Sequence, residues 1–289
     1  MVGEGDKRRW QKLPREKYPK PLIFHDGRLA LAPTPLDALA LFMWVPFGLT
    51  LCMFRLFAYG SLPTKISHPL NALSGTHLTV TIPKTRSSYS NTKEEDKSRG
   101  VVYACNHRTL LDAAYLSLIL NKSLIAVAYS SSRLTEIGQP NKIVRLTRKR
   151  DEDARIIDSC LNQGDMVISP EGTTCREPYL LRFSPLFSEL SEVIVPVAVN
   201  SHATMFYGNT ASGFKFMDPF FFMMNPAPTY SFQMLDKVSG SSTCHDGGKS
   251  KFDVANQVQS EIGKALGFEC TGFTRRDKYM LLAGNNGTV

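Results

Sequence analysis

His107 and Asp112 stand in a spacing that could carry acid–base chemistry in this 289-residue chain. They follow a β-branched apolar run, 101–105, that predicts a strand, and they bracket the start of an apolar helical pattern near Leu110. If a tight turn joins the predicted strand to the helix, the Asp112 carboxylate can fold back beneath the His107 imidazole. It would then hold one His tautomer and stabilise the imidazolium, so the other ring nitrogen could act as a base near neutral pH.

The same stretch has a purely structural interpretation. Thr109 to Asp112 also matches a helix N-terminal capping box, and an acidic residue near a helix start is favoured by the helix dipole. From this stretch alone, catalysis and capping stay open as about equal alternatives.

A second chemical segment covers residues 170–178, where a predicted strand runs into a polar loop. Its side chains offer a carboxylate, a glycine, two hydroxyls and a guanidinium, from Glu171, Gly172, Thr173, Thr174 and Arg176. Glycine lets backbone amides approach a phosphate, hydroxyls donate to its oxygens, and arginine binds them bidentately. The carboxylate would accept from a substrate hydroxyl or orient an arginine. The alternative is an ordinary polar loop with a glycine turn.

Between these segments, residues 142–151 predict a strand that runs into a cationic turn, with Arg148 at the strand's end. His107, Arg148 and Glu171 each lie just beyond the carboxyl end of a predicted strand. In an open α/β sheet those ends line one crevice, which is the usual ligand site. A base, a cation and a carboxylate are therefore expected to converge there.

The pattern after residue 100 predicts an α/β fold with a largely parallel, mixed sheet covered by helices on both faces. The expected strands are 77–82, 101–105, 124–128, 143–147, 165–169, 193–199 and 229–235. The expected helices are 110–120, 151–162, 184–190 and 252–265. Residues 84–100 have no apolar period and predict a surface loop.

The net charge of +8 and the sequence pI near 9.2 indicate an anionic partner. The basic residues lack aromatic interleaving and no nucleic-acid-binding motif is present, so we expect no nucleic-acid partner. Six cysteines without a Cys-x-x-Cys pair argue against a zinc knuckle or a disulfide scaffold, and fit a reducing compartment.

The N-terminal part predicts membrane association. Residues 1–32 form a basic polar lead, and residues 33–62 hold an uncharged stretch between Asp37 and Arg55. Pro46 and Gly48 interrupt its middle, where a helix would kink or turn back. A membrane-embedded helical hairpin is preferred, a short tilted span comes next, and a buried soluble helix pair comes last.

These segments resemble the glycerolipid acyltransferases. Asn106 to Asp112 is similar to the family's His-x-x-x-x-Asp motif. Residues 170–184 resemble the third block of the membrane-bound glycerol-3-phosphate acyltransferases of land plants, and Val195 to Ala198 resembles the fourth. The similarity runs from about residue 28 to the end, so residues 63–289 are expected to form the acyltransferase domain.

The chain departs from the family pattern at two blocks. Thr147 and Arg148 stand where the second block often reads Ile-Asp-Arg, and two residues precede the arginine of the third block. The phosphate partner therefore stays open between Arg148, Arg176 and Arg182. The plant enzymes also carry an N-terminal phosphatase-like domain with an Asp-x-Asp motif, whereas Asp151 to Asp153 here predict a helix start.

The resemblance implies acyl transfer from acyl-CoA to a hydroxyl of glycerol 3-phosphate, giving lysophosphatidic acid for glycerolipids or for cutin and suberin precursors. His107 would be the base and Asp112 its orienting group. Arg148, Arg176 and the loop 171–174 would bind the phosphate, and backbone amides at 107–109 would stabilise the thioester oxyanion. No metal and no further cofactor is implied. The expected location is the endoplasmic reticulum membrane, with the catalytic domain facing the cytosol.

Two other functions stay open. One is the same chemistry on a lysophospholipid (1-acylglycerol 3-phosphate) acceptor, and the other is a membrane lipid- or CoA-binding protein without turnover. A covalent cysteine route is disfavoured, because Cys105 lies inside a predicted strand and Cys175 in the phosphate loop. The oligomeric state is left open.

Overall fold

The computed structural model describes residues 35–83, 99–129, 141–210, 215–239 and 248–284. The basic lead, 1–32, and most of the predicted loop 84–100 lie outside these described residues. The strands are β1 (His77–Thr81), β2 (Val102–Cys105), β3 (Ile125–Ala128), β4 (Lys142–Arg145), β5 (Met166–Ile168), β6 (Tyr179–Leu180), β7 (Val193–His202), β8 (Thr229–Met234), β9 (Val238–Ser239) and β10 (Glu269–Cys270). The helices are α1 (Pro35–Ser61), α2 (Thr64–Leu73), α3 (Asp112–Leu120), α5 (Arg150–Gln163), α6 (Leu186–Leu190), α7 (Asp218–Met223), α8 (Lys251–Leu266) and α9 (Arg275–Ala283).

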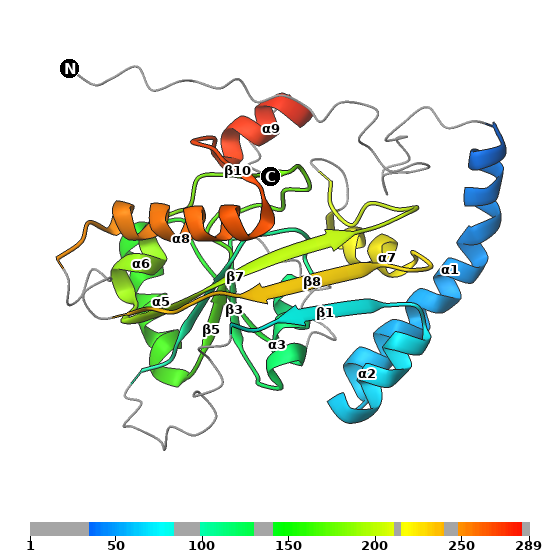
Figure 1. The fold of residues 1–289 in the computed structure, drawn as a ribbon, viewed down its shortest axis with the longest axis horizontal. Helices are drawn as coiled ribbons and strands as arrows, with labels where there is room; N and C mark the ends of the chain where they lie inside the picture. Colours follow the sequence, from blue (N-terminus) through cyan, green and yellow to red (C-terminus); the bar gives the residue numbers. More distant parts are fainter. Residues whose placement is uncertain (1–34, 84–98, 130–140, 211–214, 240–247, 285–289) are drawn as a thin grey trace.

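The predicted mixed sheet is confirmed. Its strands run in the order β1-β8-β7-β2-β5-β3-β4, with β9 paired to β7. Figure 1 shows β7, β8 and β1 side by side. The five strands from β7 to β4 are parallel to their neighbours, β8 is antiparallel to β7, and β1 is parallel to β8. The carboxyl ends of β2, β5 and β4 therefore share one edge, as the sequence predicted.

Both faces of the sheet are buried. Val102 and Ala104 of β2 pack in a core with α5, α6 and α8, whereas Tyr103 and Cys105 pack in a second core with α1, α3 and α7. Alternate side chains of a strand point to opposite faces, so one apolar run supplies both cores. All four residues of β2 are buried, which places the strand before His107 at the rigid centre of the domain.

The predicted hairpin in the N-terminal segment is wrong: α1 is one continuous helix that includes Pro46. The part of α1 that was predicted to turn, around Pro46 and Gly48, instead packs against residue 224 at the end of α7. Trp44 Nε1 donates to the carbonyl of Met224 at 2.8 Å, and a Cβ on Gly48 would lie 3.0 Å from the same oxygen. Gly48 thus lets the helix backbone approach residue 224 closely.

Arg55 does not end the apolar segment but lies inside α1 with its side chain fully buried. Its guanidinium donates to the carbonyls of Met223 and Asn225, both at 2.6 Å, and to the hydroxyl of Ser74 at 3.0 Å. Five donors in a fixed plane can satisfy several carbonyls at once. Arg55 therefore fastens α1 to the end of α7 and to the residue that follows α2, which lie beside it (Figure 1).

The other face of α1 is apolar and exposed. Phe42, Phe47 and Phe57 are 67%, 68% and 58% exposed. Within the described residues, 38–61 is the one segment long and apolar enough to cross a membrane, with a mean hydropathy of 1.8. An exposed apolar face of this size indicates contact with an apolar phase.

Candidate active site

The structure joins His107 and Asp112 as the sequence predicted. His107 Nδ1 lies 3.0 Å from Asp112 Oδ2. The His107 side chain is 19% exposed, whereas the Asp112 side chain is 1% exposed. With Nδ1 held by the buried carboxylate, Nε2 is the ring nitrogen that can take a proton from a substrate.

Asp112 also holds the turn in shape. Its Oδ2 accepts from the backbone amides of Arg108 at 2.6 Å and Thr109 at 3.0 Å, and its Oδ1 accepts from the Thr109 hydroxyl at 3.2 Å. The predicted capping box does not form, because α3 begins at Asp112 and its N-cap residue, Leu111, makes no side-chain capping hydrogen bond. The Asp112 carboxylate instead holds both the turn before the helix and the imidazole.

These hydrogen bonds correct one expectation. The amides of residues 107–109 were expected to stabilise an oxyanion, but all three donate to carboxylates: His107 N to Glu171, and Arg108 N and Thr109 N to Asp112. An amide that already has an anionic acceptor is a poor donor for a second anion.

Glu171 connects β5 to the base instead of facing the substrate with free oxygens. Its Oε1 accepts from the His107 amide at 2.8 Å and its Oε2 from the Leu181 amide at 3.0 Å. The residue is 4% exposed. Burial raises the pKa of this carboxyl to about 7, although the two amides and the nearby His107 and Arg108 lower it. We therefore regard Glu171 as a positioning residue for His107.

Two residues beside the dyad, not singled out from the sequence, hold its loop. Asn106 exchanges two hydrogen bonds with the backbone of Val199, at 2.8 and 2.7 Å, which ties the end of β2 to β7. Arg108 donates to the carbonyls of Cys175, Arg176 and Glu177 at 2.7–2.9 Å. Burial lowers its pKa. An arginine directly after a buried strand was the signal available in the sequence.

The cationic turn after β4 is built around Asp153. Its carboxylate accepts from the Thr147 amide at 2.6 Å and the Arg148 amide at 3.0 Å. Arg148 has a φ of 68°, a left-handed conformation that costs a non-glycine residue about 1–2 kcal/mol. α5 begins at Arg150, so the interpretation of residues 151–153 as helix-start acids is confirmed.

A pocket of about 430 Å³ lies at these strand ends, lined by Arg148, Glu171, Gly172, Arg182 and Arg275, among others. Gly172 has a φ of 67°, which glycine adopts without strain. Of the three arginines left open for the phosphate, Arg148 and Arg182 share this pocket. Arg275, from α9, was not predicted.

Thr173 and Thr174 are buried, each only 7% exposed, and do not line this pocket. The hydroxyl of Thr173 accepts from Lys278 Nζ at 3.2 Å, and the carbonyl of Thr174 accepts from the same ammonium. Their part in phosphate binding stays a prediction, and the structure gives them a different contact, with α9.

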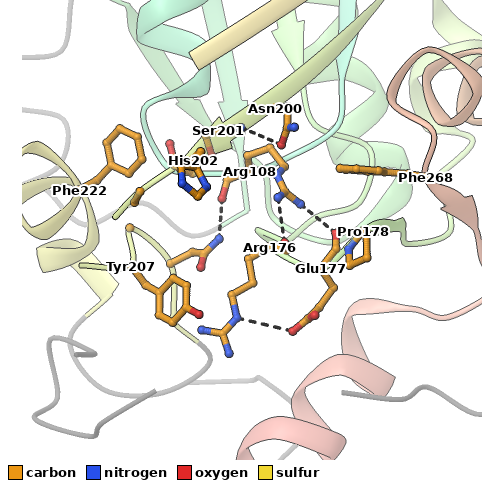
Figure 2. A pocket seen from close by; sticks show the side chains of 14 residues that line it. Arg108, Arg176, Glu177, Pro178, Asn200, Ser201, His202, Tyr207, Phe222 and Phe268 are labelled. Atoms are coloured by element: carbon orange, nitrogen blue, oxygen red, sulfur yellow. Dashed lines mark hydrogen bonds and ion pairs between the residues drawn. The ribbon is translucent and has the colours of Figure 1, made fainter. Parts of the chain in front are cut away.

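Arg176 is not brought together with Arg148. It lines a second pocket of about 610 Å³, with Arg108, Thr109, His202 and Tyr207. Figure 2 shows the Arg108 guanidinium reaching the 176–177 backbone and Arg176 reaching Glu177. The Arg176 guanidinium lies 4.1 Å from the centroid of the Tyr207 ring. Arg176 and Gly172 therefore line different pockets, although they belong to the same loop.

The cysteines near the site are poor nucleophiles. Cys105 and Cys175 are both buried, and burial raises their thiol pKa values to about 12 and about 11. A thiol with such a pKa carries almost no thiolate at neutral pH. This supports the view that the dyad, not a cysteine, carries the chemistry.

The fold and the site define a class: an α/β domain with a His–Asp base beside arginine-lined pockets. Residues 83–200 match the family model described as Acyltransferase. Over these residues the predicted resemblance to the acyltransferases is confirmed.

Two plant proteins illustrate the similarity. The chain is 57% identical over 295 residues to "Probable glycerol-3-phosphate acyltransferase 2" of Arabidopsis thaliana, covering 100% of this chain and 55% of that protein. It is 48% identical over 277 residues to "Glycerol-3-phosphate acyltransferase RAM2" of Petunia hybrida, covering 96% and 57%. The chain thus spans about half the length of the curated relatives it matches.

One solved structure, the 1-acyl-sn-glycerophosphate acyltransferase PlsC of Thermotoga maritima, is similar with a TM-score of 0.46 and 15% sequence identity. The likeness covers 80% of this chain and 95% of that one.

Proposed function

We propose that this chain transfers an acyl group from acyl-CoA to a hydroxyl of glycerol 3-phosphate and releases lysophosphatidic acid. The observation that carries the proposal is the His107–Asp112 pair, joined through Glu171 to a pocket lined by Arg148 and Arg182. A base alone fits many reactions. A base beside paired guanidinium groups fits a phosphorylated alcohol.

The proposed reaction has two steps. His107 Nε2 takes the proton of the acceptor hydroxyl as its oxygen attacks the thioester carbonyl, and Asp112 stabilises the imidazolium that forms. The tetrahedral intermediate then collapses, the C–S bond breaks, and the imidazolium returns the proton to the CoA thiolate. General base catalysis of this kind contributes about 10²–10⁴ in rate.

The two pockets suit two substrates. The pocket with Arg148 and Arg182 would take the acceptor phosphate, which turns an encounter into an oriented complex. The second pocket includes Thr109, whose amide and hydroxyl bind Asp112, so one of its lining residues contacts the dyad. It combines apolar and cationic side chains, among them Phe268 and Arg176, and would take the acyl-CoA donor.

The membrane belongs to the same proposal. α1 presents an exposed apolar face, and the relatives are named as acyltransferases that use a glycerol phosphate. We assign the chain to the endoplasmic reticulum membrane with its catalytic domain facing the cytosol, supplying glycerolipids or cutin and suberin precursors.

An acceptor comparison tests the proposal. The purified chain in detergent micelles is given one acyl-CoA and either labelled glycerol 3-phosphate or labelled 1-acylglycerol 3-phosphate, and the products are resolved by thin-layer chromatography. Lysophosphatidic acid from the first acceptor at the higher kcat/KM is the expected result. Preferential formation of phosphatidic acid would assign the chain to the lysophospholipid acyltransferases, and no product from either would favour a binding protein.

A further inference from the structure

The C-terminal helix α9 reaches the pocket that holds Arg148 and Arg182. Its first residue, Arg275, and the preceding Thr274 both line this pocket. Four arginines line the pocket, and one of them, Arg150, pairs with Glu189. The other three come from the turn after β4, the segment after β6 and α9, so three separate parts of the chain supply them. Burial lowers the pKa of the Arg275 guanidinium, and the positive charge of Arg148 lowers it further.

Three sets of contacts fix α9 in this place. The Lys278 ammonium donates to the Thr173 hydroxyl at 3.2 Å and to the Thr174 carbonyl, and Lys278 is only 5% exposed. The Arg182 amide donates to the Phe273 carbonyl at 2.8 Å. A capping box between Thr274 and Asp277 defines the start of the helix. Arg275 is therefore held at the pocket by the same loop that positions His107.

The carboxylates that line the pocket are engaged elsewhere. Asp153 accepts from the amides of the Arg148 turn, and Glu171 accepts from the amides of His107 and Leu181. Glu189 pairs with Arg150 at 2.7 Å and with Lys251 at 3.3 Å. The Arg275 guanidinium also lies 5.0 Å from the centroid of the Tyr279 ring. Arg148, Arg182 and Arg275 line the pocket together, and a phosphate with three terminal oxygens matches their guanidinium groups.

We propose that Arg275 of α9 is a third phosphate-binding side chain, which makes the C-terminal helix part of the acceptor site and a determinant of its preference for phosphorylated alcohols. This inference rests on the proposed function, since it places the acceptor phosphate between Arg148, Arg182 and Arg275. It adds a residue outside the four sequence blocks that resemble the family.

The test compares Arg275→Gln and Arg275→Lys with Arg276→Gln. Arg276 is the matched control, because it is the next residue of α9, is exposed, and does not line the pocket. Arg275→Gln is expected to raise the KM for glycerol 3-phosphate about tenfold or more, with the KM for acyl-CoA unchanged. Arg275→Lys should recover part of this loss, because it restores the charge but not the bidentate geometry.

A binding measurement separates this inference from the proposed function. Calorimetric titration with inorganic phosphate at low ionic strength needs no turnover, and the thermal midpoint of each variant reports its fold. A phosphate affinity that falls about tenfold in Arg275→Gln and stays unchanged in Arg276→Gln supports the inference even if no lysophosphatidic acid forms. If Arg275→Gln fails to fold, Arg275→Lys is compared with wild type instead, and its phosphate affinity is expected to fall by less than tenfold.

Three results would overturn the inference. One is equal phosphate affinity and equal KM for glycerol 3-phosphate in wild type, Arg275→Gln and Arg276→Gln. Another is no phosphate binding by the folded wild-type protein. The third is an equal rise of the KM for both substrates together with a lowered thermal midpoint, which would mean that Arg275 only stabilises α9.

Discussion

The backbone amide of His107 donates to Oε1 of Glu171 at 2.8 Å, so the loop after β5 sets the position of the base after β2. Glu171 Oε2 is held in turn by the Leu181 amide at 3.0 Å. The acid lies between two fixed donors and has no freedom to follow a substrate. Glu171 thus links the loop that carries His107 rigidly to the segment that carries Leu181. A carboxylate is needed at position 171 because its two oxygens accept from both backbone amides.

This arrangement gives a pH-dependent stability. Burial raises the pKa of Glu171 from 4.5 to about 7, so the folded state holds this proton more tightly than the unfolded chain. The free energy of unfolding contributed by Glu171 therefore falls as the pH rises from about 4.5 to 7, and the loss is complete above 7. Relative to Glu171→Gln, which does not titrate, the wild type should lose up to about 3 kcal/mol over this window.

Chemical denaturation of both proteins in detergent at pH 5 and pH 8 measures the effect. The absolute cost of Glu171→Gln is not the observable, since an amide group facing one of the two backbone donors destabilises the fold at any pH. The observable is the difference in the free energy of unfolding between wild type and Glu171→Gln, compared at pH 5 and at pH 8. A difference that stays constant with pH would show that Glu171 keeps an ordinary carboxyl pKa.

Asp112→Asn tests the orienting role of the carboxylate. Asp112 Oδ2 accepts from His107 Nδ1 and from the amides of Arg108 and Thr109. An amide group offers one acceptor, so its NH₂ would face a donor and the imidazole would lose its fixed tautomer. We expect kcat to fall about 10²–10⁴-fold, measured with saturating glycerol 3-phosphate and acyl-CoA.

The control for that variant is Tyr230→Phe. Tyr230 contacts the Thr109 hydroxyl, one step further from the base, so its loss should cost less in kcat than Asp112→Asn. Near-normal kcat in a folded Asp112→Asn protein, judged by its thermal midpoint, would limit Asp112 to a structural role in the turn before α3.

The two pockets predict different effects of two arginines that the sequence had grouped together. Arg148→Ala should raise the KM for glycerol 3-phosphate about tenfold and change the KM for acyl-CoA little. Arg176→Ala should affect acyl-CoA more, because Arg176 lines the other pocket, against Tyr207. Steady-state kinetics with each substrate varied in turn provides the measurement. Identical patterns in the two variants would refute the assignment of separate substrate pockets.

The exposed face of α1 predicts membrane binding that resists salt. Phe42, Phe47 and Phe57 are all more than half exposed, and each buried aromatic side chain is worth about 1.5–3 kcal/mol. The wild-type protein should stay with membranes at high salt, since apolar insertion is not screened. Replacing the three by Ser should release it.

Phe252→Ser is the control for this effect, because Phe252 is 57% exposed but lies on α8. The measurement is the fraction of protein that pellets with membranes after a high-salt wash. Release of the wild-type protein by salt alone would show that headgroup charge, not α1, holds it.

The strands and the dyad were predictable because their determinants are local. Apolar runs fix the strands, and the turn that joins His107 to Asp112 spans only five residues, so the chain cannot separate the pair widely. Arg148 and Glu171 share a pocket, and Glu171 binds the His107 amide. Both relationships followed from one general rule, that the carboxyl ends of parallel strands meet at one edge.

The parts that sequence patterns missed depend on distant contacts. Arg275 and Lys278 reach the site from α9, about a hundred residues after the loop that they contact, and nothing in their local pattern marks them. Arg176 adjoins the predicted phosphate loop, but the Arg108 guanidinium binds the surrounding carbonyls and turns it to the other pocket. The hairpin prediction for α1 failed because Pro46 and Gly48 were read as breaks, whereas Gly48 serves a close contact with residue 224.

The central claim is that His107 is the base of an acyl transfer to glycerol 3-phosphate, and one measurement tests it most directly. Labelled lysophosphatidic acid formed from glycerol 3-phosphate and acyl-CoA is compared for wild type, His107→Ala and His77→Ala, an exposed histidine on β1. The account predicts that His107→Ala lowers kcat about 10²–10⁴-fold at an unchanged thermal midpoint, and that His77→Ala matches wild type. Near-wild-type formation of lysophosphatidic acid by folded His107→Ala would contradict it.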